Sequence, residues 1–183
     1  MSRGIDGAKL IHQRKPTEPH GRFVTFRIAT LEQARYNDWV ISIQGAHVEF
    51  PVFTSVHLVK GEDLNHHGTL YAGRTAEWFV ESGFISAASM TKPENIVCLK
   101  IHGMTFTRPI RKGDLVTFAS RVVLTGETKI CSYIQVTVKD KVAVRGFITF
   151  VHVDLEGKPM PHGLNFVPQT EEEKALYEEA KAL

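Results

Sequence analysis

The sequence predicts an α+β domain in which an antiparallel β-sheet is wrapped around a central α-helix. One observation is the stretch from Arg74 to Met90, where apolar side chains recur at intervals of three and four residues and cover most faces of a helix. The other is the chain after Pro93, where apolar and polar residues alternate in runs separated by short turn signals. A helix with so little polar surface must be buried, and a curved sheet buries it most simply.

The segment in front of the helix is expected to contain one strand and one loop. Residues Val48–Val59 are dense in β-branched and aromatic side chains, which favours a strand, and the polar residues Gly61-Glu62-Asp63 end it. The stretch Leu64–Gly73 is rich in Asn, His and Gly, and we interpret it as an irregular loop that leads into the helix.

Four strands and one further helix are expected after Pro93. The alternating runs define the strands as Ile96–Phe106, Leu115–Leu124, Lys129–Lys139 and Val142–Val153. Short turns join them, so adjacent strands should pair antiparallel. The acidic amphipathic stretch Thr170–Leu183 is predicted to be a helix, with Thr170 and Glu173 as its capping box.

A strand, a buried helix and four strands joined by short turns make up the hotdog fold. A single sheet of this kind has exposed edges and a thin core, so we expect two copies to pair edge to edge with one continuous sheet. We assign residues 1–45 to a partly disordered N-terminal extension, residues 46–166 to the hotdog domain and residues 167–183 to a C-terminal helix.

The composition argues against several classes of protein. Of the 183 residues, 43% are hydrophobic and 23% are charged, a balance typical of soluble globular domains. The formal net charge is only +2, so we expect no nucleic-acid partner. No stretch approaches the roughly 20 apolar residues that cross a bilayer, and residues 1–21 lack the apolar core of a signal peptide. We therefore expect a cytoplasmic protein with no membrane partner, in which Cys98 and Cys131 are free, buried thiols.

Four stretches of the chain carry a recognisable pattern: Glu62–Gly73, Met104–Val116, Val123–Gly126 and Phe147–Pro161. In this order and spacing they resemble the acyl-CoA thioesterases of the hotdog fold. The resemblance implies that water hydrolyses an acyl-CoA thioester at an active site shared between the subunits of a homodimer or higher homo-oligomer. It also implies that no cofactor is needed, because CoA is part of the substrate.

Thioester hydrolysis requires groups that polarise the carbonyl and place the water. A helix N-terminus offers free backbone N–H groups and a partial positive charge, and the predicted helix opens near Gly73. Gly73 would let the acyl group approach the backbone, or would merely ease the turn into the helix. The resemblance implies that Asn65 orients the water or holds the thioester, although Asn also favours an Asx-turn in any loop.

The same loop supplies candidate substrate-binding residues. His66 and His67 could bind the carbonyl or carry a proton, because imidazole titrates near neutral pH; the alternative is that they are simply solvated. Gly68 and Tyr71 belong to the same motif and are assigned to substrate binding with them. No pair of histidines has a ligand spacing with a supporting acid, so no metal site is predicted.

The general base is the point at which the sequence departs from the family. The resemblance places an Asp or Glu seven residues beyond the helix-opening Gly, and Val80 occupies that position here. Glu81 matches the second acid of a pair that many relatives carry, and Glu77 lies one helical turn earlier. Either carboxylate is a candidate base. The alternative is that both belong to a solvated or interface stripe of the helix, paired with Arg74 or with a partner chain.

A small basic cluster, Arg108, Arg111 and Lys112, lies at a predicted strand end and its turn. These residues are candidates for binding the phosphates of CoA at a dimer edge, and the alternative is the ordinary solvation of a charged turn.

Two other functions remain open. A hotdog module that has lost its acid, as Val80 permits, would act as a sensor that binds acyl-CoA without hydrolysing it. A hotdog hydratase or dehydratase would use an Asp-x-x-Pro-x-His arrangement, and the stretch Asp63–His67 lacks both the Pro and the spacing.

Overall fold

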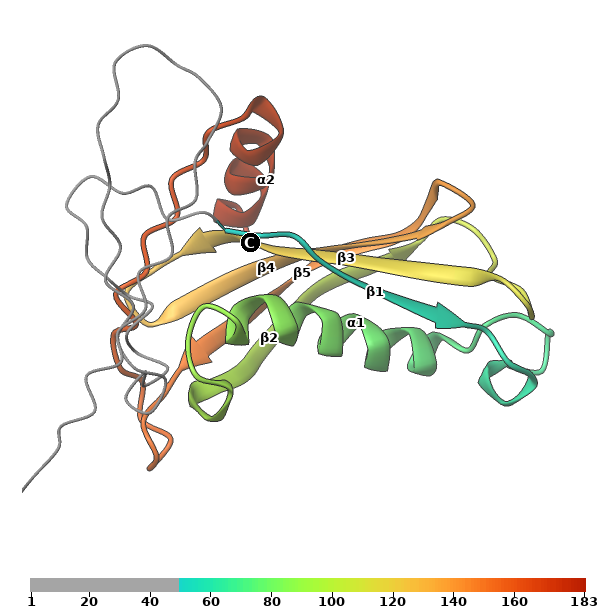
Figure 1. The fold of residues 1–183 in the computed structure, drawn as a ribbon, viewed down its shortest axis with the longest axis horizontal. Helices are drawn as coiled ribbons and strands as arrows, with labels where there is room; N and C mark the ends of the chain where they lie inside the picture. The colour runs from blue at the N-terminus through green and yellow to red at the C-terminus, as the bar shows by residue number, and fades with distance from the viewer. Residues whose placement is uncertain (1–49) are drawn as a thin grey trace, which may run out of the picture. The chain divides into compact units, whose positions relative to one another are not determined.

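The computed structural model of the chain describes residues 50–183, which contain five β-strands and two α-helices (Figure 1). The strands are β1 (Phe53–Leu58), β2 (Ile96–Phe106), β3 (Leu115–Thr125), β4 (Lys129–Val138) and β5 (Lys141–His152). The helices are α1 (Ala72–Ala88) and α2 (Glu171–Lys181), with short 3-10 turns at Gly61–Asp63 and Pro93–Asn95. Each element predicted in this part of the chain is present. The extension predicted for residues 1–45 and the predicted strand start at Val48 lie outside the described residues.

The strands form one antiparallel sheet in the order β1-β3-β4-β5-β2. The strands β3, β4 and β5 are neighbours in both sequence and space, and a tight turn with Lys139 and Asp140 at φ angles of 50° and 59° joins the last two. The strands β1 and β2 are the two edges of this sheet. The arrangement confirms the predicted α+β hotdog fold.

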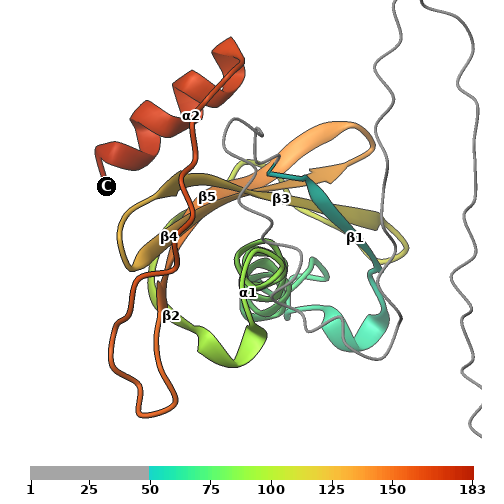
Figure 2. The ribbon, with the colours of Figure 1, turned by 60° about the vertical axis from the view of Figure 1, so that its left-hand side comes forward.

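Helix α1 lies inside the curve of the sheet, where Figure 2 shows it end-on. Phe79 is 0% exposed at the centre of the contact between helix and sheet. A Cβ atom on Gly83 would lie only 3.0 Å from the side chain of Ile134 and 3.1 Å from that of Ile148. Glycine therefore lets the helix approach β4 and β5 closely.

The buried face of α1 differs from the predicted apolar face because it contains serines. Ser82 and Ser86 are buried, whereas Val80 is only partly buried on the flank of the helix. The hydroxyl of Ser120 donates to the backbone oxygen of Ser82 at 2.6 Å, and the hydroxyls of Ser86 and Ser132 lie 2.8 Å apart. These small polar groups are tolerated inside the core because each has a hydrogen-bond partner.

Helix α2 covers part of the opposite, outer face of the sheet (Figure 2). Its buried residues Leu176 and Ala180 pack against a second apolar cluster of the sheet: Val123, Cys131, Tyr133 and Phe147. The predicted capping box is confirmed, because Thr170 Oγ1 accepts the N–H of Glu173 and Glu173 Oε2 accepts the N–H of Thr170, both at 3.1 Å. Among residues 50–183, no helix is long and apolar enough to cross a bilayer.

Edge strand β2 exposes several apolar side chains. Val97, Leu99 and Ile101 are 51%, 57% and 43% exposed. The prediction of two buried thiols is right for Cys131 and wrong for Cys98, which is exposed because β2 has a neighbouring strand on one side only. A row of exposed apolar residues along an unpaired edge indicates an interaction surface.

Candidate active site

The loop between β1 and α1 is organised around the buried carboxylate of Asp63. This residue is 5% exposed, and its Oδ2 accepts the N–H of Lys60 at 2.9 Å. Its Oδ1 lies 3.2 Å from Nε of Arg74, and its backbone oxygen accepts the N–H of Tyr71 at 2.8 Å. One carboxylate therefore ties the start of the loop to the first turn of α1.

Asn65 adopts the Asx-turn that its loop position favours. Its Oδ1 accepts the N–H of His67 at 2.9 Å and that of Thr69 at 3.2 Å, while its Nδ2 donates to Thr69 Oγ1 at 3.0 Å. These bonds fix the orientation of the amide. The second hydrogen of Nδ2 has no partner among the described residues, so it is available to a ligand.

The first turn of α1 presents free backbone donors. The helical hydrogen-bond ladder starts at Thr75, whose N–H donates to the backbone oxygen of Tyr71 at 3.0 Å. The N–H groups of Ala72, Gly73 and Arg74 therefore lie outside the ladder. Tyr71, at the N-cap position, makes no side-chain capping bond. The positive end of the helix is thus suited to stabilise an oxyanion.

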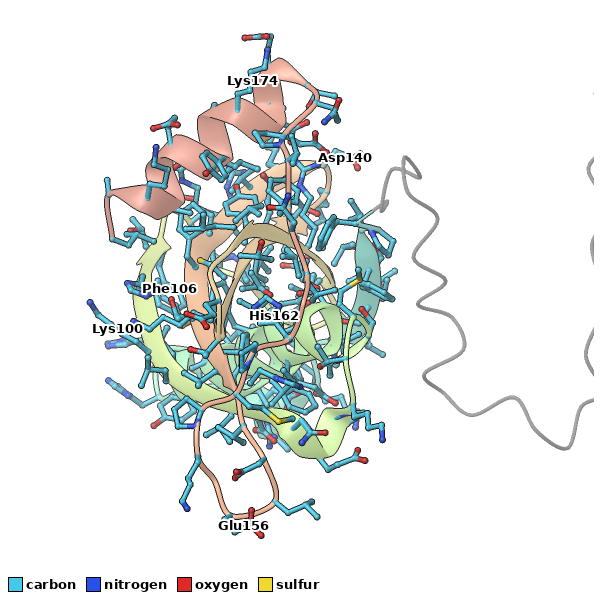
Figure 3. The ribbon with its side chains drawn as sticks, turned by 90° about the vertical axis from the view of Figure 1, so that its left-hand side faces the viewer. Lys100, Phe106, Asp140, Glu156, His162 and Lys174 are labelled. Carbon is cyan, nitrogen blue, oxygen red and sulfur yellow. The ribbon has the colours of Figure 1, made fainter. Side chains whose placement is uncertain are left out.

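A cavity of about 420 Å³ opens beside this helix end. The loop and the first turn of α1 line it with Asn65, Thr69, Leu70, Ala72 and Thr75. The end of β2 and the residues after it line it with Phe106, Thr107, Arg108, Pro109 and Ile110; Figure 3 labels Phe106 on β2. The volume falls in the range of small-molecule sites. No Asp or Glu is among the lining residues.

The two candidate bases lie outside this cavity. Glu77 is 62% exposed, and its carboxylate is 2.6 Å from Nη1 of Arg74. Glu81 is exposed on the side of α1 turned away from the sheet and makes no ion pair or hydrogen bond with the described residues. Val80, at the position of the family acid, packs against the apolar core. The chain's own cavity thus lacks a carboxylate.

The other predicted loop residues surround the cavity without lining it. His66 and His67 are exposed, with ring centroids 3.9 Å apart. Gly68 has a φ of 72°, in the left-handed region that glycine favours. The ring of Tyr71 lies over Gly73, where an added Cβ would collide with it. Gly73 itself is exposed, and its backbone N–H lies outside the helical hydrogen-bond ladder.

The basic cluster lies along the side of the cavity formed after β2. Arg108 lines the cavity, and Arg111 forms an isolated β-bridge with Thr69 of the loop. Asp114 Oδ2 accepts the N–H of Arg111 at 2.8 Å. The pKa of Asp114 lies below its usual range, mainly because Lys139 donates a hydrogen bond to the carboxylate and secondly because Arg111 does. Within residues 50–183, Arg108, Arg111 and Lys112 form no ion pair. They are therefore free to meet an anion.

Sequence reasoning missed Thr69, Thr75 and Phe106 as lining residues. Thr69 and Phe106 lie inside recognised stretches and could have been found there, whereas Thr75 depends on how the first turn of α1 is placed. Across the described part of the chain, no three His, Cys, Asp or Glu side chains are grouped as metal ligands.

Comparison with known proteins agrees with this architecture. The family model of the thioesterase superfamily matches residues 67–144. The cytosolic acyl coenzyme A thioester hydrolase of Mus musculus is 32% identical over 142 residues, which are 73% of this chain but only 37% of that protein. The chain thus spans well under half the length of this relative. An uncharacterised acyl-CoA thioester hydrolase of Bacillus subtilis is 32% identical over 124 residues, 64% of this chain and 71% of that protein.

Solved structures share the fold. An apo-hexameric acyl-CoA thioesterase superimposes with a TM-score of 0.67 at 31% identity, over 72% of this chain and 86% of that one. An acyl-CoA hydrolase from Staphylococcus aureus, in complex with butyryl-CoA and CoA, gives a TM-score of 0.64 at 25% identity, over 72% and 82% of the two chains. Similarity in sequence and in structure leads to one assignment: the chain belongs to the acyl-CoA thioester hydrolase family, within the thioesterase superfamily.

Proposed function

We propose that the chain hydrolyses an acyl-CoA thioester to a free acid and CoA. The observation that carries the proposal is the cavity at the N-terminal end of α1, which combines unused backbone N–H groups with the fixed amide of Asn65. A thioester oxygen at the helix end would gain hydrogen bonds as water attacks the carbonyl and negative charge develops on that oxygen. Collapse of this intermediate breaks the C–S bond and releases CoA as thiolate, which then takes up a proton.

We assign the general base to Glu81 of a second copy of the chain. No carboxylate lines the cavity, so a base must come from elsewhere. Glu81 is exposed and has no partner within the described residues, whereas Glu77 is already held by Arg74. The exposed apolar edge of β2 favours pairing of two copies, and a related thioesterase is hexameric. These features support active sites that are shared within a homo-oligomer.

The residues around the cavity suit the parts of acyl-CoA that lie beyond the thioester. Arg108, Arg111 and Lys112 would meet the phosphates of CoA, and the exposed histidines His66 and His67, with Gly68 and Tyr71, would border the acyl-CoA. Attack by water needs no cofactor. The name of the cytosolic mouse relative supports a cytoplasmic location.

Release of free CoA from acyl-CoAs of increasing chain length tests this function. We expect turnover with at least one chain length and a loss of about 100-fold or more in kcat in the Asn65→Ala variant, since a single oxyanion-hole donor contributes that much. Because Cys98 is a free and exposed thiol, protein without substrate serves as the blank for an assay that detects thiols. Absence of turnover across the whole series would contradict the proposal.

A second candidate is an acyl-CoA sensor, which Val80 favours because an apolar side chain stands at the position of the family acid. Such a module would bind a non-hydrolysable acyl-CoA analogue tightly and release no CoA from any thioester. The same assay, combined with calorimetric binding of the analogue, separates the two functions.

A further inference from the structure

A second hollow, of about 340 Å³, lies on the outer face of the sheet, and we call it the outer groove. Strands β2, β4 and β5 form its floor through His102, Cys131 and Thr149. The C-terminal end of α2 forms one wall through Ala180 and Leu183. The groove shares no lining residue with the cavity at the N-terminal end of α1, so it is a separate site.

The floor of the outer groove is polar, and its charged side chains are basic. Thr149 pairs with Cys131 on one side and with Lys100 on the other in the sheet register, and its Oγ1 lies 2.8 Å from Nε2 of His102. Lys100, labelled in Figure 3, and Lys129 also line the groove, and neither has an ion pair within residues 50–183. No Asp or Glu lines it. Two unneutralised ammonium groups thus lie beside hydrogen-bonding side chains.

The walls of the outer groove are apolar. Leu183 is 49% exposed after the end of α2, and Leu124 on β3 is partly buried. Leucines beside unpaired lysines complement a molecule that has an anionic head and a short hydrocarbon tail. A purely inorganic anion would leave these leucines in water, and a neutral lipid would leave the lysines without a partner.

We propose that the outer groove binds a medium-chain carboxylate, with its head between Lys100 and Lys129 and its chain along Leu124 and Leu183. A carboxylate of this kind is also what thioester hydrolysis releases. The inference nevertheless rests on the chemistry of the groove and holds whether or not the chain hydrolyses thioesters.

Histidine signals distinguish this site from the active site. The chain has nine histidines; His102 lies in the outer groove, and His66 and His67 lie in the loop of the candidate active site. Burial, and then the charge of Lys100, hold the pKa of His102 below its usual range. A carboxylate bound to Lys100 would offset that charge, so the pKa of His102 should rise on binding.

The experiment is a titration of the full-length protein, labelled with carbon-13 in its histidine rings, with octanoate. We expect the signal of His102, assigned with a His102→Asn variant, to shift saturably. The double variant Lys100→Gln/Lys129→Gln removes the two partly exposed ion pairs that octanoate would form with the lysines. It should therefore bind octanoate about tenfold more weakly. The control Lys158→Gln removes an exposed lysine from a turn outside the groove and should leave binding unchanged.

Three results would overturn the proposal. The signal of His102 could stay fixed while only those of His66 and His67 move, which would confine octanoate to the active site. Acetate could shift the His102 signal at the same concentrations as octanoate, which would show that the apolar walls contribute nothing to binding. Octylammonium could shift the His102 signal at the same concentrations as octanoate, which would show that the lysines contribute nothing to binding.

Discussion

Replacing Glu81 with Gln is expected to lower kcat for acyl-CoA hydrolysis by about 100-fold or more, with KM little changed. Gln keeps the size of the side chain but cannot accept the proton of water, and a general base typically contributes ~10²- to 10⁴-fold. Glu81 makes no ion pair within residues 50–183 and is exposed, so its replacement removes no contact that stabilises the described domain. Steady-state kinetics with the best chain length measures the effect.

Glu77→Gln is the matched control, because it makes the same chemical change one helical turn away. Glu77 is 62% exposed and paired with Arg74, and such surface pairs contribute little to stability. The kcat of the Glu77→Gln variant should stay within about twofold of the kcat of the unchanged protein, as expected for a carboxylate that does not act as the base. A loss in Glu77→Gln as large as that in Glu81→Gln would contradict the assignment of the base.

Replacing Phe79 with Ala is expected to lower the free energy of unfolding by about 3–5 kcal/mol, the usual cost of removing a buried aromatic ring. Phe79 is 0% exposed and lies where α1 meets the sheet, so the space left behind is closed on all sides by the core. Denaturant unfolding at one fixed protein concentration measures the change, because assembly would otherwise alter apparent stability.

Phe106→Ala is the control for this prediction. Its ring is 47% exposed at the end of β2, so the same truncation should cost no more than about 1 kcal/mol. Equal losses in the two variants would show that α1 is not the centre of the core.

The strands and α1 were predictable from the sequence because their signals are local. The alternation in residues 96–106 gave β2 its observed ends, and the Thr170–Glu173 pair marked the start of α2. The Asx-turn of Asn65 was one of the two interpretations that the sequence allowed. It was predictable because its hydrogen bonds reach only to His67 and Thr69, two and four residues along the chain.

Features that depend on distant contacts were not predictable. The exposure of Cys98 follows from the place of β2 at the sheet edge. Ser82 is buried on the face of α1 that packs against the sheet, where its backbone oxygen accepts the hydroxyl of Ser120 on β3. The absence of any carboxylate from the cavity follows from the orientation of α1, which turns Glu77 and Glu81 away from the sheet. The periodicity of apolar residues in the sequence identifies the buried face of a helix. It does not show which strand lies against each side of that helix.

Subunit mixing tests most directly the central claim, that Asn65 of one copy and Glu81 of another form one active site. The Asn65→Ala and Glu81→Gln variants would be mixed in equal amounts, dissociated and reassembled, with different affinity tags to verify mixed oligomers. Random pairing gives about half mixed pairs, each with one intact site of two, so about a quarter of full activity should return. If mixed oligomers form but activity stays at the level of the separate variants, the two residues do not act together across subunits.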